Sequence, residues 1–365
     1  MRKKLWSEEK QKLVSAYLNQ GLTYAQIAKE MKITLDAVEK ATRRYSLRKT
    51  ETYPTTVKET KPKNEKETTK EIMATLREEL AKVEPYTASI ESKIDKKGDT
   101  LVIHLTDLHA GKIVKDQEGT VIYDQSIFRV RMDRLCQQIL KLLDHNIRKG
   151  VPITDVVILS TGDLANGEGI YATQAYEQEL APPRQVMLVI EVIQKLILAL
   201  LERKLPVRFY GIRGNHGRTG KDTDIASNWD LMIYMILEFW AKMVLKSSKL
   251  EIHYAETEHM KLDIRGHGYL IRHIAPEQVD SPAGRVKINE WARRHEVEGI
   301  VYGHYHHAGI FDCDSVRVFR GGSTVGGDSL SESMAKHSEP LQLVFGVNEH
   351  RVSTFIYLVD LGGKE

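Results

Sequence analysis

The stretch LVIHLTDLHAG, residues 101–111, decides how the rest of the chain is interpreted. Its first five residues form an apolar run interrupted only by His104, which predicts a buried strand. The run ends in Asp107-Leu108-His109, where the chain must leave the sheet for a loop. Ligands of open α/β sheets bind outside the carboxyl ends of the strands, so a carboxylate and an imidazole stand where a metal or cofactor would bind. An Asp-x-His pair alone is common in loops, and the other strand ends decide what it means.

Four further predicted strands also end in residues that can bind a metal. These residues are Asp163 after strand 155–160, Asn215 and His216 after strand 207–212, His273 after the second arm of a hairpin around Gly266, and His304 and His306 after strand 299–302. Three glycines precede these clusters and predict sharp turns there: Gly162, Gly214 and Gly303. Five such ends in one α/β body favour a shared site. The simpler interpretation, a structural or surface histidine, is given to His104, His145, His253, His267, His307 and His337.

Together, these five motifs resemble, in the same order, those of the calcineurin-like metallophosphoesterases. The resemblance covers residues 100 to about 325. Within that superfamily, the chain looks most like phage and bacterial homologues of the Mre11/SbcD DNA repair exonucleases. The resemblance implies an α/β fold in which a two-sheet β-sandwich is flanked by helices, with a two-metal site at the strand ends.

Carried over residue by residue, the resemblance implies a role for each cluster. Asp107, His109 and His306 bind one metal ion. Asn215, His273 and His304 bind the other, and Asp163 bridges both. His216 is not a ligand but a catalytic residue that faces the substrate.

The residue types agree with two-metal chemistry. Carboxylate, amide and imidazole ligands favour Mn²⁺, with Fe and Zn²⁺ as alternatives, over Ca²⁺. Two such ions can hold a hydroxide and clamp phosphate oxygens, so no serine or cysteine nucleophile is needed.

The sequence departs from the family pattern directly after His216. The family usually has an acidic residue there, which steadies the catalytic histidine, whereas this chain has Gly217. Asp222 and Asp224 are candidates to replace it. Arg218 lies on the same loop and is a candidate ligand for the substrate phosphate, although a solvated arginine is the simpler interpretation.

Residues 1–49 predict a small all-α domain of three short helices, with Thr23 and Gln26 as a capping box for the second. The pattern resembles Myb/SANT-like and phage helix-turn-helix modules. Residues 1–49 carry 12 lysines and arginines against 5 acidic residues, whereas residues 99–365 carry 31 against 35. A basic domain on a mildly acidic body indicates a polyanionic partner. The predicted DNA contacts are Lys40, Arg43, Arg44 and Arg48, and a protein-docking module is the alternative.

Residues 50–98 have the composition of a charged linker. Within them, residues 66–83 could form a helix whose apolar stripe docks on the body or pairs with a second copy, so a homodimer is left open. Residues 99–365 form the predicted catalytic domain. Two cysteines and a charged N-terminus without an apolar core indicate a cytoplasmic protein. No apolar run reaches the ~18 residues that a membrane span requires.

The sequence therefore predicts a two-metal phosphodiesterase that hydrolyses DNA, as an exonuclease of DNA repair, recombination or phage DNA processing. One alternative is a phosphodiesterase or phosphatase for a small nucleotide or a phosphoprotein, because long loops after Asp107 and Asn166 could shape a closed pocket. Another is a DNA-binding regulator with an inactive metal site.

Overall fold

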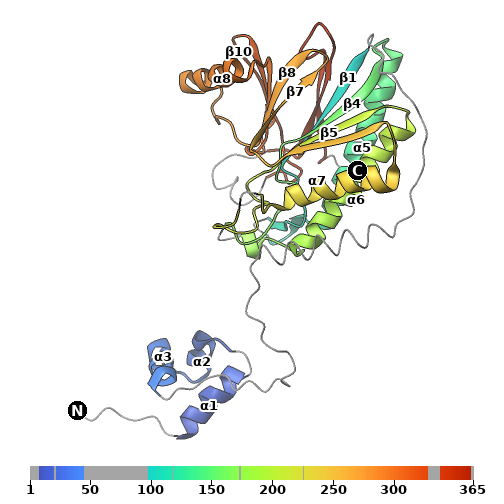
Figure 1. Ribbon diagram of the computed structural model, residues 1–365. Coiled ribbons are helices and arrows are strands. Elements are labelled where there is room, and N and C mark those ends of the chain that lie inside the picture. The colour runs from blue at the N-terminus through green and yellow to red at the C-terminus, as the bar shows by residue number, and fades with distance from the viewer. Residues whose placement is uncertain are drawn as a thin grey trace. The chain divides into compact units, whose positions relative to one another are not determined.

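The computed structural model describes residues 8–19, 22–44, 98–116, 118–171, 174–224, 226–327 and 338–362. The chain divides into two compact units, Met1–Thr68 and Thr69–Glu365 (Figure 1). Of the linker expected at 50–98, residues 50–97 lie outside the described residues, and so does the helix expected at 66–83. None of the helices in the described ranges is long and apolar enough to cross a membrane.

The first unit contains three helices, α1 (Glu8–Asn19), α2 (Tyr24–Glu30) and α3 (Leu35–Arg44). The predicted capping box at the start of α2 is confirmed: Thr23 N donates to Gln26 Oε1 at 2.8 Å and Gln26 N donates to Thr23 Oγ1 at 3.3 Å. The three helices share a small apolar core of Val14, Ile27, Ala28 and Val38. Because this core is small, burial of apolar surface stabilises the three-helix unit less than it would a larger domain.

A six-stranded sheet forms the centre of the second unit, in the order β13-β12-β1-β4-β5-β6. Four strands run parallel: β1 (Asp99–Leu105), β4 (Ile153–Ser160), β5 (Val207–Ile212) and β6 (Leu250–Ala255). The other two, β12 (Leu341–Val347) and β13 (Ile356–Asp360), extend the sheet with antiparallel pairing beyond β1. Strand β1 is therefore central and buried on both faces, as its apolar run predicts.

Three helices cover one face of this sheet (Figure 1): α5 (Gln125–Arg148), α6 (Pro182–Glu202) and α7 (Trp229–Phe239), which continues as a π-helical segment (Trp240–Leu245). Alternate residues of β1, Leu101, Ile103 and Leu105, join the core beneath these helices. This alternation leaves Val102 on the opposite face, toward the second sheet.

The second sheet has the order β10-β11-β9-β8-β7. Its strands are β7 (His259–Ile264), β8 (His267–Arg272), β9 (Gly299–Tyr302), β10 (Gly309–Cys313) and β11 (Val316–Arg320). Helix α8 (Pro282–His295) packs on its outer face. Between the sheets, Val102 and Phe345 share an apolar core with Tyr269 and Phe319, and the rings of Phe319 and Phe345 stack at 4.2 Å. The two sheets and the helices on their outer faces form the predicted two-sheet sandwich flanked by helices.

The segment after Tyr302 contributes strands to both sheets. Strands β10 and β11 belong to the second sheet, whereas β12 returns to the first and pairs with β1, and β13 pairs with β12. A short hairpin is formed by β2 (Val114–Lys115) and β3 (Val121–Tyr123). Apolar runs predict strands, but they do not say which sheet edge each run will join.

Candidate metal centre

The five predicted clusters meet at the carboxyl ends of their strands. Strands β1, β4 and β5 run parallel in the first sheet, and β8 and β9 run parallel in the second. Their trailing loops bring together three groups of metal-capable side chains, and within each group the donor atoms lie within 4.8 Å of one another. The groups are Asp107, His109 and His306; His109, Asp163 and His216; and Asp163, His273 and His304.

The first group surrounds one unpartnered carboxylate oxygen. Asp107 is fully buried, and its Oδ2 accepts hydrogen bonds from Thr106 Oγ1 at 2.7 Å and from the His304 backbone N–H at 2.8 Å. Its Oδ1 has no hydrogen-bond partner and lies 3.9 Å from His109 Nε2 and 3.6 Å from His306 Nε2. A buried oxygen without a donor is costly unless something binds it. One anchored oxygen, one unpartnered oxygen and two facing imidazoles fit a divalent cation.

The third group is built around His273. Its Nδ1 lies 2.7 Å from the backbone carbonyl of Thr161, which sets the tautomer and directs Nε2 toward the site. There Nε2 lies 2.6 Å from Asn215 Oδ1 and 3.1 Å from Asp163 Oδ2. Three atoms that carry lone pairs face one another, so the arrangement needs a positive charge among them. In a metal-free chain a proton on His273 supplies it, and a bound cation would replace that proton.

Asp163 connects the groups, because it belongs to the second with His109 and His216 and to the third with His273 and His304. His109 in turn belongs to the first group. Its side chain is almost wholly buried. Burial alone would raise the pKa of Asp163, but the neighbouring His273 and His216 hold it well below its usual range. The carboxylate is therefore charged, which suits a ligand shared between two cations.

The backbone at these residues is unusual. The angle φ is positive at five of them: 51° at Asp107, 44° at His109, 53° at Asp163, 76° at His304 and 60° at His306. Left-handed conformations cost a non-glycine residue about 1–3 kcal/mol and persist where the surrounding structure fixes them. Such strain gathers at functional sites, and here it turns side chains from the three loops after β1, β4 and β9 toward a common point.

A profile of the calcineurin-like phosphoesterases matches residues 100–308, more than half of the chain. The chain belongs to the calcineurin-like phosphoesterase family. Family membership makes it a phosphoester hydrolase that depends on divalent metal ions, and the donor groups above fit such ions.

The solved structures that are similar to the chain include three with low sequence identity. Vps29 from Entamoeba histolytica, crystallised with zinc, is 13% identical, with 72% of this chain and 99% of that chain covered and a TM-score of 0.33. A protein described as a novel archaeal phosphodiesterase is 13% identical, with 71% and 99% covered and a TM-score of 0.33. A hypothetical protein from Pyrococcus horikoshii is 12% identical, with 72% and 88% covered and a TM-score of 0.36. No curated protein sequence matches the chain.

Burial and neighbouring charges set the protonation of the other metal-capable residues. It raises the pKa of Asp107 to about 7, lowers that of His304 to about 4 and lowers that of His109 well below its usual value. Burial would also lower the pKa of His273, but Asp163 raises it to about 9. At neutral pH, His109 and His304 are therefore neutral imidazoles with a lone pair to offer, as metal binding requires.

The catalytic candidate His216 faces the same point. Its ring centroid lies 4.6 Å from that of His109. Its Nδ1 lies 3.4 Å from Gln174 Nε2, and the backbone of Asn166 hydrogen-bonds to the ring. Gln174 is itself buried and hydrogen-bonded to the backbone of Asn166, so the loop after β4 holds the imidazole.

Asp222 and Asp224, which the sequence offered as replacements for the missing acidic residue, do not fill that role. Both are exposed, and Asp224 Oδ1 accepts a hydrogen bond from the backbone N–H of Ala226. They lie in a surface turn beyond the loop that carries His216, so neither side chain is placed to steady the imidazole.

A carboxylate that the sequence analysis missed, Asp230, ties two of the motif loops together. It is fully buried near the start of α7. Its Oδ2 accepts hydrogen bonds from Gly214 N at 2.8 Å and Asp163 N at 2.9 Å, and its Oδ1 accepts from Leu164 N at 3.0 Å. The loops after β4 and β5, which carry Asp163 and Asn215, are thus fixed to the same side chain.

The same carboxylate explains Gly217. A Cβ at this position would lie 2.6 Å from Asn228 Oδ1 and 3.2 Å from Asp230 Oδ2. The space that a side chain would need after His216 is therefore filled by Asn228, the N-cap of α7, and by Asp230 in its first turn. In sequence these two residues look like an ordinary helix cap and first-turn acid, so only their hydrogen-bond partners in the fold reveal the role.

The glycines before the motifs have two different explanations. The predicted sharp turn is confirmed at Gly162, where φ is 94°. Gly214 and Gly303 are not among the described residues with positive φ, so a left-handed backbone does not explain them. A Cβ at Gly303 would lie 2.5 Å from Asp107 Oδ2, so glycine there leaves room for the ligand carboxylate.

The predicted DNA contacts belong to the first unit. Lys40 and Arg43 are exposed on α3, and Lys40 pairs with Asp36 at 2.7 Å. The side chain of Arg44 and all of Arg48 lie outside the described residues. Lys40 and Arg43 therefore lie on a solvent-exposed face of α3, and Lys40 is already partly neutralised.

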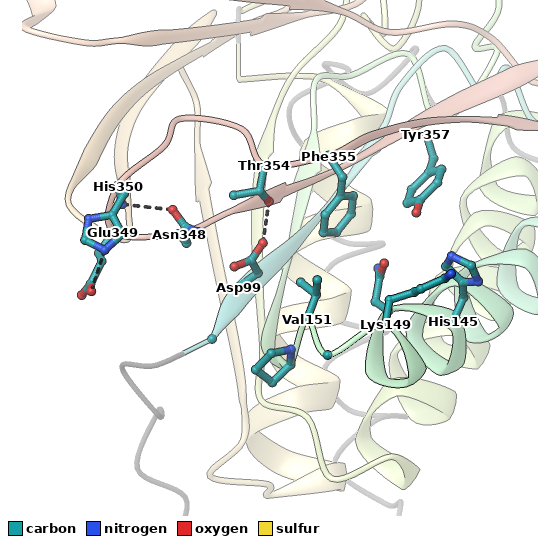
Figure 2. A pocket seen from close by; sticks show the side chains of 14 residues that line it. Asp99, His145, Lys149, Val151, Asn348, Glu349, His350, Thr354, Phe355 and Tyr357 are labelled. Carbon is teal, nitrogen blue, oxygen red and sulfur yellow. Dashed lines mark hydrogen bonds and ion pairs between the residues drawn. The ribbon is translucent and has the colours of Figure 1, made fainter.

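A cavity of about 680 Å³ lies at the other end of β1 from Asp107. Figure 2 shows Phe355 and Tyr357 on one side of it and His145 and Lys149 on the other. Its carboxylate, Asp99, is hydrogen-bonded to Thr354. None of the metal-capable groups found among the described residues includes a residue of this cavity, so its size does not make it the reaction site.

Proposed function

We propose that the chain is a two-metal phosphodiesterase that hydrolyses DNA as an exonuclease, in DNA repair, recombination or phage DNA processing. The observation that carries the proposal is the set of metal-capable groups joined through Asp163. Its DNA specificity is supported by the basic helical unit at the N-terminus, which carries 12 lysines and arginines against 5 acidic residues in residues 1–49.

In this proposal Asp107, His109 and His306 hold one ion, and Asn215, His273 and His304 hold the other, with Asp163 between them. Bound there, two divalent ions, with Mn²⁺ favoured, would supply activation of a water molecule and neutralisation of the phosphate oxygens. The chain itself holds these ligands in position. The Thr106 hydroxyl donates a hydrogen bond to Asp107 Oδ2, and His273 Nδ1 donates one to the Thr161 carbonyl. No side-chain nucleophile takes part.

His216 acts on the substrate. Burial lowers the pKa of His216, although Asp163 opposes this, so the ring is neutral at neutral pH. The nitrogen that faces the site can take up a proton and donate a hydrogen bond to the negative charge that develops on the phosphate or on the leaving oxygen. The loop contacts from Gln174 and Asn166 keep the ring in the orientation that this role needs.

The test is DNA cleavage by the full chain on linear and circular DNA, single- and double-stranded, with Mn²⁺ or a chelator. We expect linear DNA to be degraded with Mn²⁺, covalently closed circles to survive, and the chelator to stop the reaction. If no DNA is cleaved but a small diester such as bis(p-nitrophenyl) phosphate is hydrolysed, the small-nucleotide alternative replaces this proposal. If neither is hydrolysed with any divalent ion, the regulator with an inactive metal site replaces it.

The role of the N-terminal unit is tested by a matched pair of double variants in the full chain. Lys40→Ala with Arg43→Ala should weaken DNA binding and lower the slope of log K against log salt by about 2, because each lost phosphate contact removes about 0.9. Lys12→Ala with Lys29→Ala removes the same charge from the exposed faces of α1 and α2 and should change the slope little. Equal slopes for the two pairs would contradict DNA contact through α3.

A further inference from the structure

A second cavity, of about 380 Å³, adjoins the group formed by Asn215, His273 and His304. Besides these three side chains, it is lined by residues from the loops after β4, β5 and β8 and from the turn between β6 and β7: Tyr171, Arg213, Gly214, Arg218, Glu258, Arg272 and Ile274. The cavity therefore opens beside one of the two proposed metal positions and not beside the other.

The charges lining this cavity do not cancel. Arg213 is buried and satisfied, since its guanidinium bonds the Glu256 carbonyl at 3.1 Å and Glu258 at 3.2 Å. Arg218 and Arg272 are different. Each uses only its Nε on a backbone carbonyl, that of Asn215 at 3.1 Å and that of Ile274 at 3.3 Å, and neither makes an ion pair with any described residue.

Both guanidinium groups are held in place. The Arg272 guanidinium lies 4.1 Å from the centre of the Trp291 ring, a cation–π contact that leaves its edge for other partners. Arg218 is fixed by its bond to the backbone of the ligand residue Asn215. Glu258 acts electrostatically on Arg272 but forms its ion pair with Arg213. Two half-buried, positioned guanidinium groups without an ion pair of their own are suited to bind phosphate oxygens, often with two parallel hydrogen bonds.

The cavity also has an apolar wall. Tyr171 is 41% exposed and Ile274 is 46% exposed, although both border a polar site. Tyr171 accepts a hydrogen bond from Asn215 Nδ2 at 2.7 Å, and its ring lies 4.8 Å from that of His216. The ring is therefore held beside the reaction site, where a flat or apolar part of a substrate can pack against it.

We infer that this cavity binds the part of a nucleotide substrate that carries a second phosphate, next to the one that is hydrolysed. Arg218 and Arg272 hold the second phosphate, and the nucleoside packs against Tyr171 and Ile274. This inference rests on the proposed phosphodiesterase function. It adds that the enzyme distinguishes a substrate with two phosphates around one nucleoside from a substrate with only the scissile phosphate.

Two matched chromogenic substrates test it: thymidine 5′-(p-nitrophenyl phosphate), and the same ester with a 3′-phosphate. The unaltered chain should hydrolyse the two-phosphate ester with a kcat/KM roughly ten- to a hundredfold higher, the effect of charge-assisted hydrogen bonds to one more phosphate. Arg218→Gln with Arg272→Gln should bring the ratio close to one, whereas Arg272→Lys alone should retain part of it. Arg203→Gln, an exposed arginine paired with Asp144, should leave the ratio unchanged.

Binding gives a readout that does not depend on turnover. Thymidine 3′,5′-bisphosphate should bind the unaltered chain more tightly than thymidine 5′-monophosphate in calorimetry, and the double variant should lose that difference. No preference in the unaltered chain, or a preference that survives the double variant, would overturn the inference. If neither ester is hydrolysed, the phosphodiesterase proposal fails separately, and the binding difference still decides whether the cavity holds a second phosphate.

Discussion

His216→Ala is expected to lower kcat about 10²–10⁴-fold, the usual contribution of a positioned acid–base or hydrogen-bonding group. The imidazole is half-buried, and its donor atom lies within 4.8 Å of those of His109 and Asp163. Gln174 and Asn166 hold the ring in place, and the proposal does not assign it as a metal ligand. Its removal takes a donor from the reacting phosphate but leaves the seven proposed ligands in place. The metal affinity should therefore stay nearly constant while the rate falls.

The measurement is kcat for bis(p-nitrophenyl) phosphate together with Mn²⁺ binding by calorimetry. His253→Ala is the matched control, because His253 is an exposed histidine on β6 that takes no part in the site. A variant with an unchanged rate would remove His216 from the mechanism. Loss of one Mn²⁺ per chain would make His216 a ligand instead, which its place in the group with His109 and Asp163 allows.

Asp230→Ala is expected to damage both folding and metal binding. The substitution leaves the buried N–H groups of Asp163, Leu164 and Gly214 without an acceptor, at about 1–3 kcal/mol each, so the free energy of unfolding should fall by about 3 kcal/mol or more. The loops that carry Asp163 and Asn215 also lose their common anchor. Removal of groups that orient ligands typically costs 10–100-fold in metal affinity, and we expect about that loss for Mn²⁺.

Urea unfolding and Mn²⁺ titration measure the two effects. Asp230→Asn keeps one acceptor oxygen and should give smaller losses in both. Asp224→Ala serves as the control, because this carboxylate is exposed in a surface turn. If Asp230→Ala unfolds at the same urea concentration and binds Mn²⁺ as tightly as the unaltered chain, the carboxylate does not organise the site.

The sequence predicts those features that depend on neighbours along the chain. The run from Leu101 to Leu105 is apolar because both faces of β1 are covered, and the polar residues begin where the strand ends. The same rule places Asp163, Asn215 and His304 at strand ends. Because parallel strands share one edge of a sheet, their convergence also follows.

The remaining features depend on partners that are distant in sequence. Asp230 looks like any first-turn acid of a helix, and only the fold brings the amides of Asp163 and Gly214 to it. Gln174 lies in a loop whose sequence does not indicate contact with His216. The apolar sequence of β12 is compatible with either sheet, and its pairing with β1 joins segments that are far apart along the chain. Positive φ at His304 and Asp107 likewise reflects the packed site rather than residue preference.

The most direct test is a crystal of the full chain soaked in Mn²⁺, with the metal located by anomalous scattering. We predict two peaks about 3.5–4 Å apart, one among Asp107, His109 and His306 and the other among Asn215, His273 and His304, with the Asp163 carboxylate between them. A map in which Asp163 and His304 point away from each other, with no anomalous peak between the five loops, would contradict the two-metal centre.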